Sequence, residues 1–266
     1  MLIGKRGHMG LRQRKARILH GRKWGTRLVE VMIRRPEGLR PWMSQYTRIL
    51  KNDEYGLVST ALLHRQPVFV KFYARKSYWR RFWAALPIKN GRAAHCFRIG
   101  QDLAARNILV PRPMCCVRYP DGDILMTEGL ANAIDMQQLW KENPTRDRAE
   151  QCLLMAAHLI ADLHNAGYVH GDCKFSNIVL SGQTCFLVDL DATRRGVRRQ
   201  HRDIARFTLN AEELAVEPDL FEGFIQRYLA LTGLPRKRLE KRAQRRLKKL
   251  RKRHFLQYGT DAEALL

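Results

Sequence analysis

The sequence predicts an α+β, two-lobed protein in which a small antiparallel β-sheet is followed by a larger helical part. Three short runs rich in β-branched and aromatic residues begin at Tyr46, and turn-forming residues separate them. Over residues 150–165 apolar side chains instead recur at helical spacing, and Gly167 ends that segment. The change from strands to helices indicates a boundary near residues 128–130.

The first half accounts for the predicted strands and one helix. The runs YTRILKN, LVSTALL and PVFVKFY predict three antiparallel strands, joined by hairpin turns at DEYG and HRQ. Residues 92–106 have helical spacing and end at NILVPRP, and MCCVRYPDGDILMTEGL predicts a further hairpin around Asp121 and Gly122. We expect a basic N-terminal extension over residues 1–44, a first lobe over 45–128, a second lobe over 129–232, and a basic amphipathic helix with a tail over 233–266.

Composition narrows the class of protein. A chain of 266 residues can bury one large or two small cores without disulfides. Its six cysteines are scattered without a CxxC pair, which is typical of reduced, mostly buried thiols in a cytosol. The longest apolar stretch, CLLMAAHLIADLH, is far shorter than the ~20 residues that span a bilayer. A formal net charge of +24 indicates a phosphate-rich partner.

One polar stretch has the residues that phosphoryl transfer requires, which are a base, metal ligands and a lysine for the nucleotide. HGDCKFSN has the spacing of a kinase catalytic loop, with Asp172 as candidate base, Lys174 as a second candidate catalytic residue and Asn177 as a metal ligand. Asp189, in CFLVDLD, follows an apolar strand, as expected of a second metal ligand. Lys71 lies on the third predicted strand, where a kinase holds the nucleotide phosphates. Together they predict an ATP- and magnesium-dependent kinase.

Other features of the predicted site leave alternatives open. His170 is assigned to bracing of the loop. The turn NDEYGLVS contains a single glycine, Gly56, which either covers the nucleotide phosphates or only closes a hairpin. The helix after Lys71 contains no glutamate to pair with that lysine, and Asp102 is its only acid. The alternative to an enzyme is therefore a catalytically weak pseudokinase scaffold bound to membrane or RNA.

The order of VKFY, NILVPRP, LHNAGYVHGDCKFSNIVL and FLVDLD resembles the bacterial lipopolysaccharide core kinases, the Kdo and heptose kinases, over roughly residues 46–231. The resemblance implies a protein-kinase-like fold that transfers phosphate from ATP to a sugar hydroxyl of the lipopolysaccharide inner core, on heptose or Kdo. It implies Asp172 as base, Asn177 and Asp189 on magnesium, Lys71 on ATP, and adenine at the backbone near Glu128 and Leu130.

The segment that follows Asp191 bears on the acceptor. It is too short for the activation segment of protein kinases, and Gly171 stands where activatable protein kinases carry an arginine. Both features favour a glycan or small acceptor, with an atypical protein kinase or a small-molecule kinase as the alternative. Five arginines in this segment either pair with phosphates or carboxylates or form a solvated cluster: Arg194, Arg195, Arg198, Arg199 and Arg202.

The last basic segment, LPRKRLEKRAQRRLKKLRKRHF, places Leu239, Ala243, Leu247 and Leu250 on one helical face. Twelve Lys or Arg surround them over residues 236–253. Such a helix lies on anionic lipid, with RNA as the less favoured partner and a merely solvated helix as the third alternative. We expect a cytoplasmic protein, peripheral on the inner membrane. The sequence leaves open the sugar, its hydroxyl and the oligomeric state.

Overall fold

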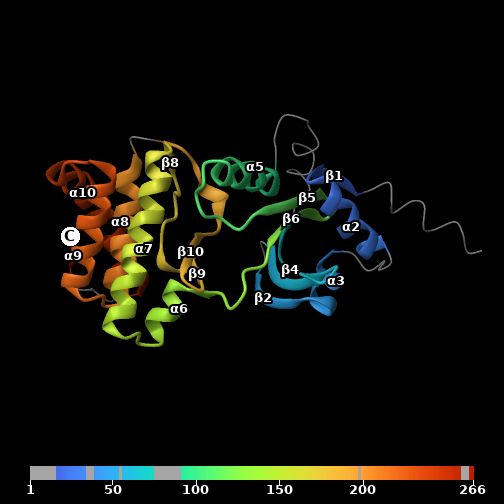
Figure 1. The fold of residues 1–266 in the computed structure, drawn as a ribbon, viewed down its shortest axis with the longest axis horizontal. Helices are drawn as coiled ribbons and strands as arrows, with labels where there is room; N and C mark the ends of the chain where they lie inside the picture. Colours follow the sequence, from blue (N-terminus) through green and yellow to red (C-terminus); the bar gives the residue numbers. More distant parts are fainter. Residues whose placement is uncertain (1–15, 34–38, 54–55, 75–90, 197–198, 259–263) are drawn as a thin grey trace, which may run out of the picture. The chain divides into compact units, whose positions relative to one another are not determined.

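The computed structural model describes residues 16–33, 39–53, 56–74, 91–196, 199–258 and 264–266. The chain folds into two compact units (Figure 1). The first contains Met1–Asp102 and Pro111–Ala131, and the second contains Leu103–Val110 and Asn132–Leu266. The basic stretch after the third predicted strand, the first fifteen residues and Arg198 lie outside the described residues.

The first unit is built on a six-stranded antiparallel sheet with the strand order β1-β5-β6-β4-β3-β2. Its strands are β1 (Arg17–His20), β2 (Arg48–Asp53), β3 (Gly56–Leu63), β4 (Gln66–Ala74), β5 (Pro113–Arg118) and β6 (Gly122–Glu128). Its helices are α2 (Arg22–Ile33), α3 (Leu39–Tyr46) and α5 (Arg92–Ala104). The predicted strands, the predicted helix and the hairpin at residues 121–122 are confirmed within about two residues at each end.

Local geometry explains the two predicted turns between β2, β3 and β4. His64 and Arg65 both have positive φ angles, 49° and 64°, which suits the tight connection of two twisted strands. At the other turn, a Cβ atom on Gly56 would lie 2.3 Å from the backbone oxygen of Phe72. The close approach of β4 therefore requires glycine at position 56.

Alternation along β4 shows which face of this sheet is buried. Val68, Val70 and Phe72 are buried, whereas the side chains between them are partly exposed. They share one core with residues of α2 and α3, such as Leu28 and Met43. Part of the segment that the sequence suggested as an extension therefore contributes a strand and two helices to this unit.

The second unit is largely helical (Figure 1). Its helices are α6 (Met136–Lys141), α7 (Arg146–Asn165), α8 (Gln200–Glu213), α9 (Pro218–Thr232) and α10 (Arg236–Tyr258), with short 3₁₀ turns η1 (Phe175–Asn177) and η2 (Leu190–Ala192). Its strands are β7 (Ile134–Asp135), β8 (Tyr168–Val169), β9 (Ile178–Ser181), β10 (Thr184–Leu187) and β11 (Arg194–Arg195). Helix α7 packs on α9, and α8 packs on α10. The predicted α+β class is confirmed.

The apolar face of α10 is buried within the protein. Leu247 and Leu250 of α10 form a core cluster with Ala205 and Leu209 of α8. This face was expected to lie on lipid or RNA, and the packing on α8 corrects that expectation, because the same side chains cannot contact both. The remaining, mostly basic side chains of α10 stay at the surface.

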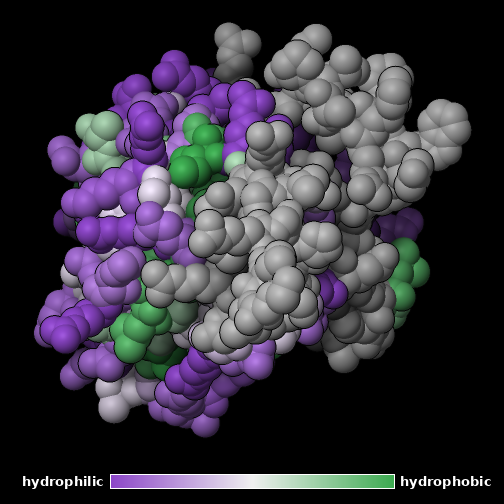
Figure 2. Space-filling view, turned by 90° about the vertical axis from the view of Figure 1, so that its right-hand side faces the viewer, coloured by the Kyte–Doolittle hydropathy of each residue, from purple (hydrophilic) through white to green (hydrophobic). Residues whose placement is uncertain are grey.

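The surface matches the charged composition. Among the residues described, no helix is both long and apolar enough to cross a membrane. On the face in Figure 2, hydrophilic side chains predominate among the coloured residues, and hydrophobic ones form small, separate patches. All six cysteines are buried and reduced, as the sequence predicted, and burial raises the pKa of Cys115 and of Cys185 to about 12.

Candidate functional site

The HGDCKFSN loop lies in the second unit, between β8 and β9. It turns sharply at Gly171, whose φ angle is 83°. A Cβ atom at this position would lie 2.8 Å from the backbone oxygen of Ala192. Because glycine alone tolerates both the angle and the contact, the arginine of activatable protein kinases does not fit at position 171.

Asp203, in the first turn of α8, holds the backbone of this loop. One of its carboxylate oxygens accepts the backbone N–H of His170 at 2.6 Å, and the other accepts that of Gly171 at 2.9 Å. The imidazole of His164 donates to the same carboxylate at 3.2 Å, and its other nitrogen lies 2.8 Å from the Tyr228 hydroxyl. The loop is therefore fixed to the helical core through one buried acid.

The carboxylate of Asp203 is ionised despite its burial. Burial alone raises the pKa of this group, but the hydrogen bond from His164, the two nearby histidines and the Gly171 N–H together outweigh burial, so the pKa lies below its ordinary value. Sequence reasoning missed the role of Asp203. An acid on the apolar face of a predicted helix, in register with Phe207, was the available signal.

Asp172 is half-buried and lies between two cations. Lys174 Nζ is 3.2 Å from one carboxylate oxygen, and Arg206 Nε of α8 is 3.4 Å from the other. Burial raises the pKa of Asp172, but Lys174 and, to a smaller extent, Arg206 lower it by more, so the net pKa is below its ordinary value. The carboxylate is thus charged at neutral pH and can accept a hydrogen bond from an incoming hydroxyl.

The two candidate metal ligands lie on neighbouring segments. The backbone N–H of Val188 donates to the Asn177 carbonyl at 3.0 Å, which brings Asp189 next to the catalytic-loop turn. The side-chain amide of Asn177 donates to the Asp172 carbonyl at 2.8 Å, so its oxygen remains as an acceptor. Asp189, two residues after the end of β10, has left-handed backbone angles, φ 59° and ψ 60°.

This pair fits Mg²⁺. Within the described ranges, no group of three His, Cys, Asp or Glu side chains could hold a metal alone. Mg²⁺ in nucleotide sites instead takes one or two protein oxygens, with substrate phosphates and water completing its shell. Asn177 and Asp189 supply two such oxygens.

His170 braces the loop, as its neighbours show. Its Nε2 donates to the Val188 carbonyl at 2.9 Å, and its side chain is fully buried. In the part of the chain that the structure describes, its Nδ1 has no hydrogen-bond partner. A buried imidazole turned toward the backbone cannot reach an acceptor hydroxyl.

The segment after Asp189 folds straight back onto the loop. Arg194 and Arg195 of β11 pair with β8, and the Thr193 hydroxyl donates to the His170 carbonyl at 3.4 Å. Arg195 Nε lies 3.2 Å from the Tyr168 hydroxyl, so this arginine has a structural contact. Helix α8 begins soon afterwards, at Gln200, and leaves no long activation segment.

The remaining predicted residues belong to the first unit. Lys71 lies in the middle of β4, paired in register with Leu125 of β6, and its Nζ is 5.0 Å from the centre of the Tyr73 ring. The backbone N–H of Glu128 donates to the Arg112 carbonyl at 3.0 Å, and the Glu128 carboxylate accepts the backbone N–H of Arg112 at 2.8 Å. The other two predicted residues are Gly56, at the start of β3, and Leu130, just after β6.

Comparison with known proteins identifies the family. No curated protein matches the sequence. The structure is similar to that of WaaP in complex with acyl carrier protein, with a TM-score of 0.53, 18% identity, and coverage of 84% of this chain and 94% of that one. A weaker likeness is to vaccinia related kinase 3, with a TM-score of 0.39, 20% identity, and coverage of 56% and 48%.

The likeness to WaaP confirms the predicted protein-kinase-like fold. The model of the lipopolysaccharide kinase (Kdo/WaaP) family matches residues 45–228, which is more than half of the chain. That range includes the loop of Asp172, the Asp189 segment and the β4 lysine. The chain therefore belongs to the lipopolysaccharide kinase (Kdo/WaaP) family, whose membership implies phosphoryl transfer from ATP.

Proposed function

We propose that this protein transfers the γ-phosphoryl group of ATP to a sugar hydroxyl, heptose or Kdo, of the lipopolysaccharide inner core. The observation that carries the proposal is the ionised, cation-flanked carboxylate of Asp172 on a loop fixed by Asp203. An ordered carboxylate of this kind is what phosphoryl transfer asks of the protein, since positioning and electrostatics supply most of the catalysis.

Each proposed site residue of the second unit then has a defined role in phosphoryl transfer. Asp172 orients the acceptor hydroxyl and takes its proton as the oxygen attacks the phosphorus. Lys174, which is 3.2 Å from Asp172, stabilises negative charge on the transferred group. Asn177 and Asp189 would hold Mg²⁺, which neutralises the phosphate charges when bound.

The first unit would hold the nucleotide. Lys71 points its ammonium to the face that also bears Tyr73, and it would bind the α- and β-phosphates. The Glu128 N–H is already bonded to the Arg112 carbonyl, whereas the Glu128 carbonyl accepts the Thr127 hydroxyl at 3.2 Å and has a second lone pair, so we assign this carbonyl and the Leu130 N–H to adenine. Gly56 has a packing reason to be glycine, which favours the hairpin interpretation over a phosphate-covering loop.

We propose a glycan acceptor because the described residues between Asp189 and α8 leave little chain for a peptide platform. Residues after Asp189 are taken up by η2 and by the pairing of β11 with β8 before α8 begins. Gly171 leaves no room for an arginine that would read a phosphorylated loop. An atypical protein kinase would need a peptide-binding surface elsewhere.

We also propose that the protein is peripheral on the cytoplasmic face of the inner membrane. The apolar face of α10 is used in packing, but its last turns expose Phe255 and Leu256, at 50% and 74%, among basic side chains. Apolar tips surrounded by Lys and Arg suit the interface of an anionic bilayer, where each basic residue contributes about 1 kcal/mol.

Substitution of the proposed base tests the function. Asp172→Ala should lower turnover on inner-core oligosaccharide by a factor on the order of 10² to 10⁴ while ATP binding remains, because the base contacts the acceptor. Mass spectrometry of the product measures the added phosphate. The matched control is Asp162→Ala, an exposed aspartate of α7. A variant that keeps half the wild-type rate would remove Asp172 from the mechanism.

A metal experiment tests the other half of the site. Asp189→Asn should weaken the binding of Mg-ATP more than the binding of metal-free ATP, since a neutral amide is a poorer magnesium ligand. Calorimetry with and without Mg²⁺ separates the two. Equal losses in both conditions would contradict the assignment of Asp189 to the metal.

A further inference from the structure

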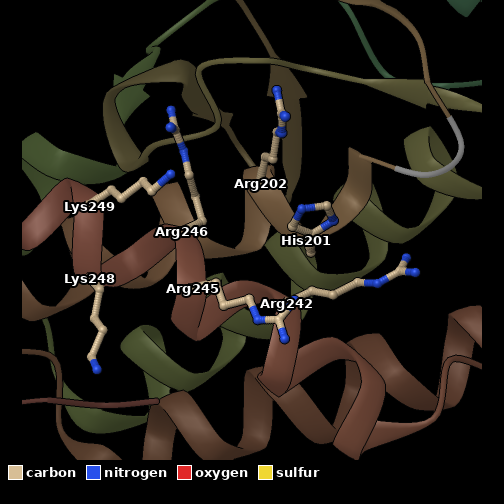
Figure 3. Close-up of a pocket in the computed structure, with 7 residues that line it drawn as sticks. All are labelled: His201, Arg202, Arg242, Arg245, Arg246, Lys248 and Lys249. Atoms are coloured by element: carbon tan, nitrogen blue, oxygen red, sulfur yellow. The ribbon is translucent and has the colours of Figure 1, made fainter.

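A basic groove lies between α8 and α10. Its volume is about 660 Å³. Seven residues line it: His201, Arg202, Arg242, Arg245, Arg246, Lys248 and Lys249. In Figure 3, Arg202 of α8 and Arg246 of α10 extend in the same direction, Lys249 reaches toward Arg246, and Lys248 points away. Arginine side chains from two helices thus line one space.

Among the described residues, the groove differs from the rest of α10 in how its charges are paired. On the same helix α10, Arg236 pairs with Glu222 and Glu240, and Arg251 pairs with the buried Glu212. For the Arg and Lys residues of the groove, the described residues provide no such ion pair. Burial lowers the pKa of Arg246, and nearby positive charges that include Arg202 and Arg206 lower it further.

The groove is connected to the proposed base by α8. Arg206 follows Arg202 by four residues, so the two side chains lie on one helical face, roughly 6 Å apart along the axis. Arg206 Nε is 3.4 Å from the Asp172 carboxylate. A molecule whose hydroxyl reaches Asp172 can therefore place a second group at Arg202 and Arg246.

Arginine-rich composition indicates what that group is. Guanidinium groups bind phosphate oxygens in pairs, whereas lysine acts as a point charge. A phosphate monoester brings about 1.5 to 2 negative charges at neutral pH, enough to offset several of these cations. The apolar side chains of α10 beside the groove, Leu247 and Leu250, are buried in the contact with α8, and the exposed Phe255 and Leu256 lie beyond it in the last turns of the helix.

We propose that the groove between α8 and α10 binds a phosphate group already present on the acceptor, through Arg202 and Arg246, and so positions its hydroxyl at Asp172. This inference rests on the proposed function, because it assigns the base to Asp172. It also places the reaction in a sequence: an earlier phosphoryl transfer must install the phosphate that the groove binds.

The test compares two acceptors and matched variants. The acceptors are a phosphorylated inner-core oligosaccharide and the same material after phosphatase treatment. The groove variant is Arg202→Gln/Arg246→Gln, and Arg242→Gln/Lys249→Gln is a second one at exposed positions, in case the first fails to fold. The control, Lys237→Gln/Arg238→Gln, removes two exposed charges of α10 outside the groove.

For the wild-type and control proteins, removing the acceptor phosphate should raise KM about 10- to 100-fold, as expected for one or two lost charge-assisted contacts. For the groove variants, KM should be high and the same for both acceptors. Equal KM values in the wild type, or a wild-type KM in both groove variants, would overturn the proposal. Groove variants that keep this KM but lose binding to acidic vesicles would identify a lipid site instead.

Failure of the proposed function is distinguishable. If the wild type phosphorylates neither acceptor, the enzymatic assignment is wrong, and the groove is then judged by thermal unfolding with inorganic pyrophosphate at constant ionic strength. Pyrophosphate should raise the unfolding temperature of the wild type and the control more than that of the groove variants. An equal rise in all of them would refute the groove as a phosphate site.

Discussion

Asp203→Asn is the substitution that most directly tests how the catalytic loop is held. The carboxylate accepts the N–H groups of His170 and Gly171 and a hydrogen bond from His164, all in buried surroundings. An asparagine keeps one acceptor oxygen but replaces the other with an N–H₂ group, which faces donors. At least one buried N–H is then left without a partner.

The size of the effect follows from these bonds. Hydrogen bonds to a charged group contribute about 1.5 to 3 kcal/mol each, and a buried unsatisfied donor costs about 1 to 3 kcal/mol. We expect Asp203→Asn to lower the free energy of unfolding by about 3 to 5 kcal/mol. For a chain of this size that corresponds to a fall in unfolding temperature of roughly 10 °C.

The effect should also depend on pH. Because the folded-state pKa of Asp203 lies below its unfolded value of about 3.9, the ionised carboxylate stabilises the protein above that pH. This contribution is lost as the pH falls through the lower, folded-state pKa. The difference between wild type and variant should therefore be constant near neutral pH and shrink below about pH 4.

Urea unfolding from pH 7 to pH 3, followed by circular dichroism, measures both quantities. The control is Asp219→Asn, an exposed acid paired with Arg146, which should leave the unfolding midpoint nearly unchanged. The reasoning is refuted if Asp203→Asn unfolds within about 0.5 kcal/mol of the wild type at pH 7, the usual range for neutral surface substitutions.

Three further predictions concern α10 and its contacts. Leu247→Ala should lower the free energy of unfolding by about 2 to 5 kcal/mol because Leu247 is fully buried, whereas Leu256→Ala, at an exposed position, should not; chemical unfolding compares them. Arg251→Met should destabilise more than Glu212→Gln, since it leaves a buried carboxylate unpaired; equal losses would contradict this. Deletion of residues 234–266 should lower both turnover and stability, because it removes α10 from the apolar face of α8. Turnover is measured on a soluble acceptor, and unchanged turnover would contradict the coupling of α8 to α10.

Residue order alone predicted which residues of the HGDCKFSN loop and of the next strand lie in one unit. The spacing of Asp172, Lys174 and Asn177, and the strand ending at Asp189, are local patterns, and the structure brings these four residues together in one unit. The hairpins of the first sheet are local in the same sense, because a short turn fixes the pairing of its flanking strands. Local patterns of this kind are readable without tertiary information.

Contacts between residues far apart in the sequence could not be predicted. The sequence of an amphipathic helix such as α10 predicts that its apolar face is buried, but the pattern does not distinguish lipid, RNA and α8 as partners. The core that Leu247 shares with Ala205 identifies α8 as the partner. Strand β1 was missed because four residues, RILH, show no period and gain their stability from pairing with β5. Asp203 was missed as an anchor because its partners lie more than thirty positions away.

The cover that α10 provides for α8 also sets when the protein can mature on the ribosome. Helix α8 begins at Gln200, but Leu250, which packs on it, is made fifty residues later. At 5 to 20 residues per second, roughly 3 to 10 s pass between these events. In that interval Leu209 is exposed on a nascent chain, a surface that a chaperone can bind. The HGDCKFSN loop, which Asp203 of α8 holds, should therefore become rigid only after translation has passed residue 250.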